Sequence, residues 1–304
     1  MKIIIRNCNV AELDIPLKYA TKLYNEFAIR HPNAFYLRTR QRGMQNWDGK
    51  IKYITKTGQF KIGLLPSVYK RCIELGIKPI IVDMRQPLPK VSKVVTQIGK
   101  YKLRPEQEKA VKAILSNKLG ETPFQIGVLD YTVNAGKTLI MSALYLSYKK
   151  QLKTLLITND SDWLNQARDE FKQYLPGEDI TFVQGKVLNW SNFTIGMVQS
   201  ISRNMKYYQN ELAKIDMVLI DEADQGGSKQ YQNAITRLFN TRVRIGLSGT
   251  IYMSKLAKDK VKNMNLRCFF GDVLAEFKLK DSIKKGYSTK TIVKTVEGKP
   301  WFGN

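Results

Sequence analysis

A seven-residue segment with the pattern of a phosphate-binding loop constrains the fold of this chain most strongly. The segment consists of Thr132, Val133, Asn134, Ala135, Gly136, Lys137 and Thr138. It lies between an apolar run that predicts a strand and an apolar-striped run that predicts a helix, which is the setting such a loop requires. Backbone N–H groups at the helix start can surround phosphates, Lys137 can supply charge to the β and γ positions, and the Thr138 hydroxyl can ligate Mg²⁺. The segment therefore predicts a nucleoside triphosphate site.

Two positions of this loop depart from the usual pattern. Tyr131 occupies the place of the first glycine, and Asn134 stands where glycine is frequent. Asparagine tolerates a left-handed backbone better than most residues, so Asn134 is compatible with the loop. A Gly-Lys-Thr tripeptide alone is common in proteins that bind no nucleotide. The flanking strand and helix are what favour the functional interpretation.

A group of carboxylates follows a later apolar run. Asp221, Glu222 and Asp224 come directly after Met217–Ile220, at the end of a predicted buried strand, where open parallel sheets bind ligands. There Asp221 can hold Mg²⁺ through water, and Glu222 can position and activate an attacking water. An isolated acidic pair is usually a solvated loop, but a phosphate loop precedes this one. The two segments together predict nucleotide hydrolysis.

Short apolar runs alternate with helix-like segments after about residue 95. The runs are Phe124–Leu129, Thr154–Thr158, Phe193–Val198, Met217–Ile220 and Val243–Leu247. Each has the length of a buried strand, and Lys137–Lys150 carries an apolar stripe at helical spacing. This alternation predicts an α/β fold with a parallel sheet between helices.

The part of the chain before residue 95 has a different pattern. Pro87 and Pro89 precede a polar, basic stretch that suits a connection between domains, which places the boundary near residue 95. The front domain is expected to be α+β. Its expected elements are helices at Leu17–Ile29 and Pro66–Leu75 and a hairpin in which Asp48-Gly49 joins Met44–Trp47 to Lys50–Ile54.

A row of arginines in the front domain suggests a contact with nucleic acid. On a strand, Arg38, Arg40 and Arg42 would share one face, with Tyr36 beside them as a stacking ring. The alternative is a charged edge strand that prevents aggregation. Trp47 is a further candidate as a wedge, although a tryptophan before a tight turn more often belongs to the core.

Charge and composition restrict the partners. Lys and Arg number 50 against 26 Asp and Glu, a net charge of +24, of which residues 1–100 carry +13. Such an excess favours a polyanionic partner over a merely soluble basic surface. The three cysteines and His31 have no paired spacing, so neither disulfides nor structural zinc is expected. No apolar run approaches about 20 residues, so no membrane span is expected and the protein should be cytoplasmic, in the host if a phage encodes it.

Further segments resemble the motifs of superfamily 2 helicases, in the order of that family. They are Leu103–Gln107 ahead of the phosphate loop, Leu155–Thr158 with Trp163–Gln166, Thr194–Ser200, and Ser248–Thr250. Each match is weak alone, and their joint order is specific. The resemblance implies a RecA-like motor domain that uses ATP and Mg²⁺, with adenine contacted by Arg104 and Gln107.

The same resemblance implies two more groups of functional residues. Gln166, Gln199 and Ser200 would contact the nucleic-acid backbone, although Asn159 stands where the family often has proline. Asp224 with Ser248, Gly249 and Thr250 would couple hydrolysis to movement.

The front domain adds a narrower resemblance. Asn46–Ile51, followed by Gly63-Leu64-Leu65, is similar to the N-terminal domain of the recombination helicases of T4-type phages. That family unwinds and branch-migrates forked or branched DNA with ATP. The resemblance makes Trp47 and Lys50 candidate DNA contacts beside Arg38, Arg40 and Arg42.

The expected organisation has three parts. Residues 1–95 are expected to form a basic α+β DNA-binding domain, and residues 96–287 the first RecA-like domain. Residues 288–304 are expected to be a linker to a second RecA-like domain in cis beyond Asn304, and Thr291–Val296 could be the first strand of that domain. Without that domain the piece should bind ATP and DNA but hydrolyse slowly, because an absent arginine finger costs about 10³–10⁵ in rate.

Three other interpretations remain open. A DEAD-box-like RNA helicase would explain the literal Asp-Glu-Ala-Asp of residues 221–224, but the other motifs differ from that group. The motor part of a restriction enzyme would require a nuclease domain, and none is recognisable in the sequence. A non-catalytic, ATP-gated DNA-binding module would not require Glu222.

Overall fold

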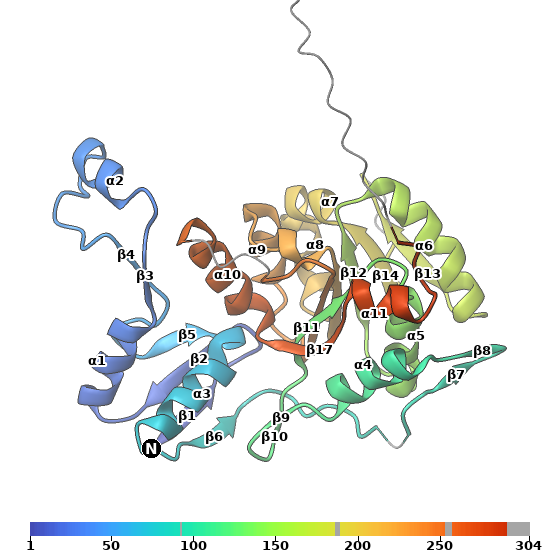
Figure 1. Cartoon of the computed structure of the whole chain (residues 1–304), viewed down its shortest axis with the longest axis horizontal. Coiled ribbons are helices and arrows are strands. Elements are labelled where there is room, and N and C mark those ends of the chain that lie inside the picture. The colour runs from blue at the N-terminus through green and yellow to red at the C-terminus, as the bar shows by residue number, and fades with distance from the viewer. Residues whose placement is uncertain (92, 186–188, 253–256, 291–304) are drawn as a thin grey trace, which may run out of the picture.

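The computed structural model describes residues 1–91, 93–185, 189–252 and 257–290. Two sheets organise these residues, a four-stranded sheet in the front part and a seven-stranded sheet in the second (Figure 1). The expected combination of an α+β front part and an α/β second part is confirmed. Within the described ranges no helix has the length and apolar character needed to cross a bilayer.

The front sheet has the strand order β5-β2-β1-β6. Its strands are β1 (Lys2–Ile5), β2 (Val10–Asp14), β5 (Gln59–Lys61) and β6 (Ile80–Asp83). Strands β1 and β2 pair antiparallel, and β1 and β6 pair parallel. Inward residues such as Ile3, Ile5 and Ala11 are fully buried, as the period of two along a strand requires.

Two helices of the front part lie close to their expected positions. Helix α1 (Leu17–Glu26) ends three residues before its expected end, because Ala28–Arg30 forms strand β3. Helix α3 (Leu65–Glu74) follows the 3₁₀ turn η1 (Ile62–Leu64) and begins with Pro66 in its first turn, where proline costs no backbone hydrogen bond.

The arginine row forms a helix, and the expected strand at residues 36–42 is wrong. Helix α2 (Ala34–Arg40) sits at the tip of an arm that projects from the front sheet (Figure 1). Ala34 is buried and Leu37 is half-buried, so the two apolar residues share one face at a spacing of three rather than two. Arg38 and Arg40 lie in the last turn, where positive charge favours a helix.

The expected hairpin is also wrong in its pairing. Asp48-Gly49 does make a turn, with Gly49 at φ 74°, but the partner of β4 (Lys50–Lys52) is β3 (Ala28–Arg30). Residues 44–47 form no strand. The arm therefore consists of the β3–β4 pair with α2 and its loops between the two strands.

The second sheet has the order β13-β14-β12-β15-β16-β11-β17, and all its pairs are parallel. Its strands are β11 (Ile126–Tyr131), β12 (Thr154–Thr158), β13 (Ile180–Val183), β14 (Phe193–Met197), β15 (Met217–Asp221), β16 (Val243–Ser248) and β17 (Val273–Phe277). The five expected strands are confirmed. The first starts at Ile126 rather than Phe124, because Phe124 bonds through its N–H to the Asn117 carbonyl outside this sheet.

Helices cover both faces of this sheet (Figure 1). They are α4 (Pro105–Leu115), α5 (Lys137–Ser147), α6 (Ser161–Tyr174), α7 (Val198–Arg203), α8 (Met205–Leu212), α9 (Lys229–Ile235), α10 (Ala257–Phe270) and α11 (Leu279–Lys284), with the 3₁₀ turn η2 (Ala223–Gln225). Two short hairpins, β7 (Gln97–Ile98) with β8 (Tyr101–Lys102) and β9 (Lys118–Leu119) with β10 (Thr122–Pro123), complete the described elements. The helices on both faces explain why most residues of the central strands are apolar and buried.

The front part packs directly on the second part. Arg244 on β16 is only 1% exposed, and its guanidinium donates to the Cys8 carbonyl at 2.7 Å and to Asn9 Oδ1 at 2.8 Å. Gly63 lies so close to α10 that a Cβ there would stand 2.1 Å from the Arg267 carbonyl oxygen. The boundary near residue 95 stays a prediction, since one hydrophobic cluster includes residues of both parts.

We predict that Gly63→Ala destabilises the chain, because the added Cβ would collide with backbone that cannot rotate away. The expected cost is about 1–3 kcal/mol in the free energy of unfolding, measured by urea denaturation. Gly227→Ala is the matched control, since a Cβ there meets nothing nearer than 3.9 Å. Equal unfolding midpoints for the two variants would contradict this close approach.

Candidate functional site

The phosphate loop connects the end of β11 to the start of α5, as the sequence predicts. Asn134 has φ 64° and Gly136, the residue before the helix, has φ 73°, so both adopt the left-handed backbone. Tyr131, in the place of the usual first glycine, is fully buried and donates from its hydroxyl to the Glu106 carbonyl at 2.7 Å. The departure at Tyr131 thus has a structural role in packing α4 against β11.

Lys137 lies between the two carboxylates that the sequence singles out. Its Nζ is 3.5 Å from Asp221 Oδ1 and 3.6 Å from Glu222 Oε1. Lys137 begins α5 after β11, whereas Asp221 ends β15, and the two strands flank β16. Parallel pairing therefore brings Lys137 and Asp221, which are far apart in sequence, to one edge of the sheet.

The two carboxylates differ in their surroundings. The Asp221 side chain is 7% exposed, and its Oδ1 accepts no hydrogen bond within the described ranges, while the Glu222 side chain is 40% exposed. Burial raises the pKa of both groups, and the nearby Lys137 charge opposes that rise. Glu222 also has a left-handed backbone, φ 51°, which turns the chain sharply after β15. A buried carboxylate oxygen with a free lone pair fits a hard cation, and Thr138 lies in the same loop.

The two candidate adenine contacts lie against the phosphate loop. Gln107 Nε2 donates to the Ala135 carbonyl at 2.9 Å, and Gln107 Oε1 accepts from the Arg104 N–H at 2.9 Å. Arg104 Nη2 donates to the Asn134 carbonyl at 3.2 Å. The structure therefore brings Arg104 and Gln107 together with the loop, through contacts to its backbone.

Three residues beside them were missed by sequence reasoning. Glu106 is buried and pairs with Lys285 at 2.7 Å and with Arg104 at 3.2 Å, and the Tyr287 ring lies 4.2 Å from the Arg104 guanidinium. Lys285 and Tyr287 come just after α11, far from the loop in sequence. Only the Glu106 position carried a signal, as an acidic residue in the first turn of a helix.

The residues expected to couple hydrolysis to movement also come together. Ser248 Oγ lies 3.1 Å from Asp224 Oδ1 and 3.4 Å from Thr250 Oγ1. A Cβ on Gly249 would stand 3.1 Å from the Thr132 Cα. The end of β16 therefore touches both the phosphate loop and the acidic turn.

The residues of the second part that are expected to contact the nucleic-acid backbone differ in their surroundings. Gln199 Nε2 donates to the Asn159 carbonyl at 3.4 Å, and Asn159 donates to Gln225 at 2.6 Å. Ser200 Oγ accepts from the Gly185 N–H at 2.9 Å. Gln166 is exposed on α6 and pairs only with Glu170 of the same helix among described residues. These side chains lie after the carboxyl ends of β12 and β14.

The arm carries the remaining candidates. Arg38, Arg40, Arg42 and Lys50 are exposed, and the Arg40 guanidinium lies 5.7 Å from the Tyr36 ring. Phe35, which sequence reasoning missed, is 79% exposed, a large apolar surface beside these charges. Trp47 is half-buried, stacked edge-on against His31 with ring centroids 5.9 Å apart, and it donates to the Lys50 carbonyl at 3.0 Å. The packing of Trp47 favours the structural interpretation for that residue.

The family of the chain follows from a comparison with family models. Residues 100–253, half of the sequence, match the family described as "Type III restriction enzyme, res subunit" (ResIII). The chain belongs to this family. The matched residues contain the phosphate loop, the acidic turn and Ser248–Thr250.

Individual relatives agree with this assignment. The ATP-dependent DNA helicase UvsW of Enterobacteria phage T4 is 23% identical over 272 residues, which are 83% of this chain and 51% of the relative. A protein of Acanthamoeba polyphaga mimivirus named as an ATP-dependent RNA helicase is 25% identical over 147 residues, 48% of this chain and 27% of the relative. The chain thus spans about half or less of the length of these curated relatives.

Solved structures show the same fold. A crystal structure of the T4 UvsW helicase superposes with a TM-score of 0.69 at 22% identity, over 91% of this chain and all of that chain. The similarity includes the front part, which the family model does not match. The expected resemblance to a superfamily 2 helicase of the T4 phage type, with a RecA-like motor domain, is confirmed.

We predict that Gly136→Ala disrupts the loop more than its backbone angle alone explains. The added Cβ would stand 2.3 Å from Gln107 Nε2 and displace the side chain that holds Ala135. Gly177→Ala is the matched control, because Gly177 also has a positive φ but open space around it. We expect about 1–3 kcal/mol more loss of unfolding free energy for Gly136→Ala. Equal losses would show that Gln107 adapts without cost.

Proposed function

We propose that the chain is the ATP-binding part of a DNA helicase or translocase that acts on branched or forked DNA. The observation that carries this proposal is the position of Lys137 Nζ within 3.6 Å of carboxylate oxygens of both Asp221 and Glu222. Lys137 follows a phosphate loop in which Asn134 and Gly136 have a left-handed backbone. Membership of the ResIII family and the similarity to UvsW support it.

In the proposed reaction ATP is the substrate and its terminal phosphate is transferred to water. Backbone N–H groups of residues 133–138 surround the phosphates, and Lys137 leaves its carboxylate partners to contact the β and γ oxygens. Thr138 and Asp221 would hold Mg²⁺, which neutralises charge that develops between those phosphates. The burial of Asp221 strengthens that contact, because little solvent screens it.

Glu222 is the proposed base. It follows Asp221 directly, but its side chain is more exposed and can face an attacking water. Burial raises its pKa, which makes it a better proton acceptor than an ordinary surface glutamate. Asp224 and Ser248 are hydrogen-bonded at 3.1 Å. We propose that this bond links the acidic turn to the end of β16, which lies against the phosphate loop.

The arm is the proposed DNA contact of the front part. Arg38, Arg40, Arg42 and Lys50 would bind phosphates, while the exposed Phe35 and Tyr36 rings would stack on bases where a branch leaves them unpaired. The similarity to the DNA helicase UvsW covers 83% of the chain in sequence and 91% in structure and so extends into the front part, whereas the similarity to the mimivirus protein covers 48% of the chain. DNA is therefore favoured over RNA.

Two substitutions test the hydrolysis site separately. We expect Lys137→Ala to lose ATP binding and turnover while DNA affinity stays within about twofold, since the arm is untouched. Glu222→Gln should keep ATP binding and lose at least about 10²-fold in hydrolysis rate. Binding is measured with a fluorescent ATP analogue and hydrolysis by phosphate release. Turnover retained by Lys137→Ala would refute the assignment.

Salt dependence tests the arm. Replacing Arg38, Arg40 and Arg42 with Gln should weaken binding of forked DNA and reduce the slope of log affinity against log salt by up to about 3. The control replaces Lys109, Lys112 and Lys118 with Gln, which removes the same charge from exposed positions of α4 and β9. Equal slopes for the two triple variants would place the DNA contact elsewhere.

Competition separates the rival functions. We expect forked DNA to displace a labelled fork at lower concentration than duplex DNA or RNA of equal length, because branch-exposed bases can reach Phe35 and Tyr36. Preferred binding of RNA would favour the RNA-helicase alternative. A chain that binds ATP and DNA while Glu222→Gln changes no rate would instead be a non-catalytic module.

A further inference from the structure

A cavity lies between the front part and the amino ends of the parallel strands. Its volume is about 440 Å³, and its lining includes Arg6, Cys8, Arg85, Lys214, Asp216 and Arg242. Arg242 and Asp216 directly precede β16 and β15. The phosphate loop and the acidic turn lie at the carboxyl ends of the same sheet, so this cavity is on the opposite edge from the proposed ATP site.

Buried guanidinium groups form the inner wall of this cavity. The Arg85 side chain is 2% exposed and the Arg242 side chain is 8% exposed. Arg85 makes two hydrogen bonds of 2.8 Å to the Asp83 carboxylate, and Arg242 Nη2 stands 3.4 Å from the same carboxylate. The buried guanidinium groups of Arg85 and Arg242 therefore share the Asp83 carboxylate. Arg244, two residues after Arg242, is also buried but does not line the cavity.

The hydrogen bonding of this group is incomplete. Arg85 Nη1, Arg242 Nε and Arg244 Nε are buried and have no acceptor in the part of the chain that the structure describes. Burial and the adjacent Arg85 charge lower the pKa of Arg242. A buried donor without a partner is unfavourable, and more so when it is charged. An acceptor of negative charge at the cavity would remove that cost.

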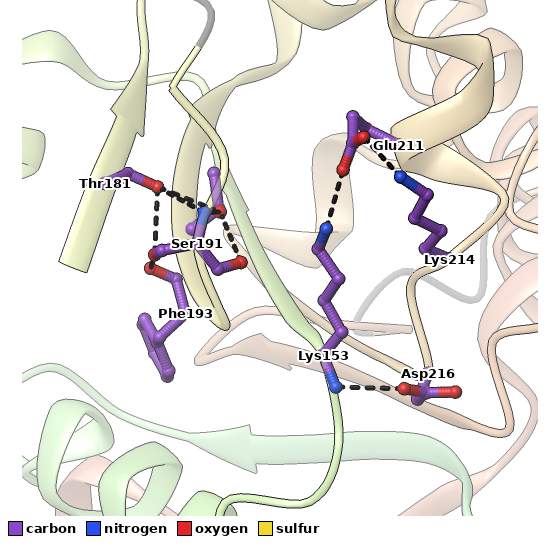
Figure 2. Close-up of polar contacts among 8 residues, drawn as sticks. Lys153, Thr181, Ser191, Phe193, Glu211, Lys214 and Asp216 are labelled. Atoms are coloured by element: carbon purple, nitrogen blue, oxygen red, sulfur yellow. Dashed lines mark hydrogen bonds and ion pairs between the residues drawn. The ribbon is translucent and has the colours of Figure 1, made fainter. Parts of the chain in front are cut away.

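Asp216, the acidic residue of the cavity lining, is held by the backbone. Asp216 Oδ2 accepts from the Lys153 N–H at 2.9 Å, and burial raises the pKa of Asp216 (Figure 2). Glu211 accepts from the ammonium groups of Lys153 at 2.6 Å and of Lys214 at 2.7 Å. Figure 2 shows its carboxylate between the two. Of the charged residues in the lining, Arg6, Arg85, Lys214 and Arg242 are basic and Asp216 is acidic, so basic side chains outnumber acidic ones at this cavity.

We propose that this cavity is a binding site for a small phosphate-class oxyanion, either inorganic phosphate or the phosphate group of a small molecule. Guanidinium N–H groups form strong hydrogen bonds to oxyanions, and Arg85 Nη1 and Arg242 Nε are buried donors without a partner on two residues that line the cavity. The bound oxyanion would connect β6 of the front part to β16 of the motor part. Since Met84 follows β6 and lines the cavity too, the site is formed by both parts of the chain.

The test uses the whole chain with Lys137→Ala, which removes phosphate binding at the phosphate loop and so keeps this proposal separate from the proposed ATP site. The midpoint of thermal unfolding is measured against inorganic phosphate and against ribose 5-phosphate, with chloride added to hold ionic strength constant. We expect a saturable rise with at least one of them, since a ligand of the folded state raises the midpoint. A larger rise with ribose 5-phosphate assigns the site to a phosphorylated small molecule, and equal rises assign it to phosphate itself.

Variants in the same background locate the site. Arg242→Gln should weaken the phosphate effect at least about tenfold, because it removes a charged donor. Should Arg242→Gln fail to fold, the rim pair Arg6→Gln with Lys214→Gln serves instead, since both side chains are largely exposed, and we expect a loss of about threefold or more. Lys56→Gln, exposed and outside the cavity lining, is the charge-matched control and should change nothing.

Two outcomes would overturn the proposal. One is a rise with phosphate that never saturates or that chloride reproduces at equal ionic strength. The other is that short duplex DNA raises the unfolding midpoint while phosphate and ribose 5-phosphate do not, and that Arg242→Gln abolishes this effect of DNA. The cavity would then belong to a DNA-binding surface.

Discussion

The parallel hydrogen-bonded ladder of β15, β16 and β11 is the constraint on which the candidate site depends. Each strand ends at the same edge, so the acidic turn, Ser248–Thr250 and the phosphate loop become neighbours without any local sequence signal that joins them. The spacing is tight, since a Cβ on Gly249 would stand 3.1 Å from the Thr132 Cα. Lys137, at the start of the helix that follows β11, can then reach Asp221 and Glu222 at the end of β15, although β16 lies between these two strands. Ser248, at the end of β16, can reach Asp224. A shift of register in this ladder would separate all three segments at once.

The same central strand also connects the two parts of the chain. β16 begins beside the arginine-lined cavity, carries Arg244 into contact with Cys8 and Asn9, and ends at Ser248 beside the acidic turn. A guanidinium this deeply buried is tolerated because backbone and amide oxygens of the front part accept its hydrogen bonds. Burial lowers the pKa of Arg244 to about 10, so it stays charged at neutral pH. The front part is thus packed on the motor sheet through a rigid strand, with Gly63 allowing the backbones to approach closely.

Sequence patterns predicted the second part of the fold better than the first, for a physical reason. The strands of a parallel sheet are buried on both faces, so continuous apolar runs such as Leu155–Ile157 and Val218–Ile220 can be recognised as strands from the sequence. The arm is mostly exposed, and its arginines give no such signal: alternation at residues 38, 40 and 42 fits a strand, yet burial of Ala34 and Leu37 decides for a helix. The loop and the carboxylates of the candidate site were predictable from local segments. Glu106 with Lys285 was not, because that pair depends on where α11 packs, and no local pattern gives this.

The contacts of Gln107 bear on its proposed role with adenine. A glutamine amide has two N–H donors and two carbonyl lone pairs. One donor is used by the Ala135 carbonyl and one lone pair by the Arg104 N–H. One donor and one acceptor remain, which is the pair that a glutamine offers to the N7 and N6 positions of adenine. The proposed contact with adenine would therefore leave the loop contact of Gln107 in place. Arg104 packs on the Tyr287 ring and donates to the Asn134 carbonyl of the same loop. In this proposal one pair of side chains would both contact the base and hold the phosphate loop.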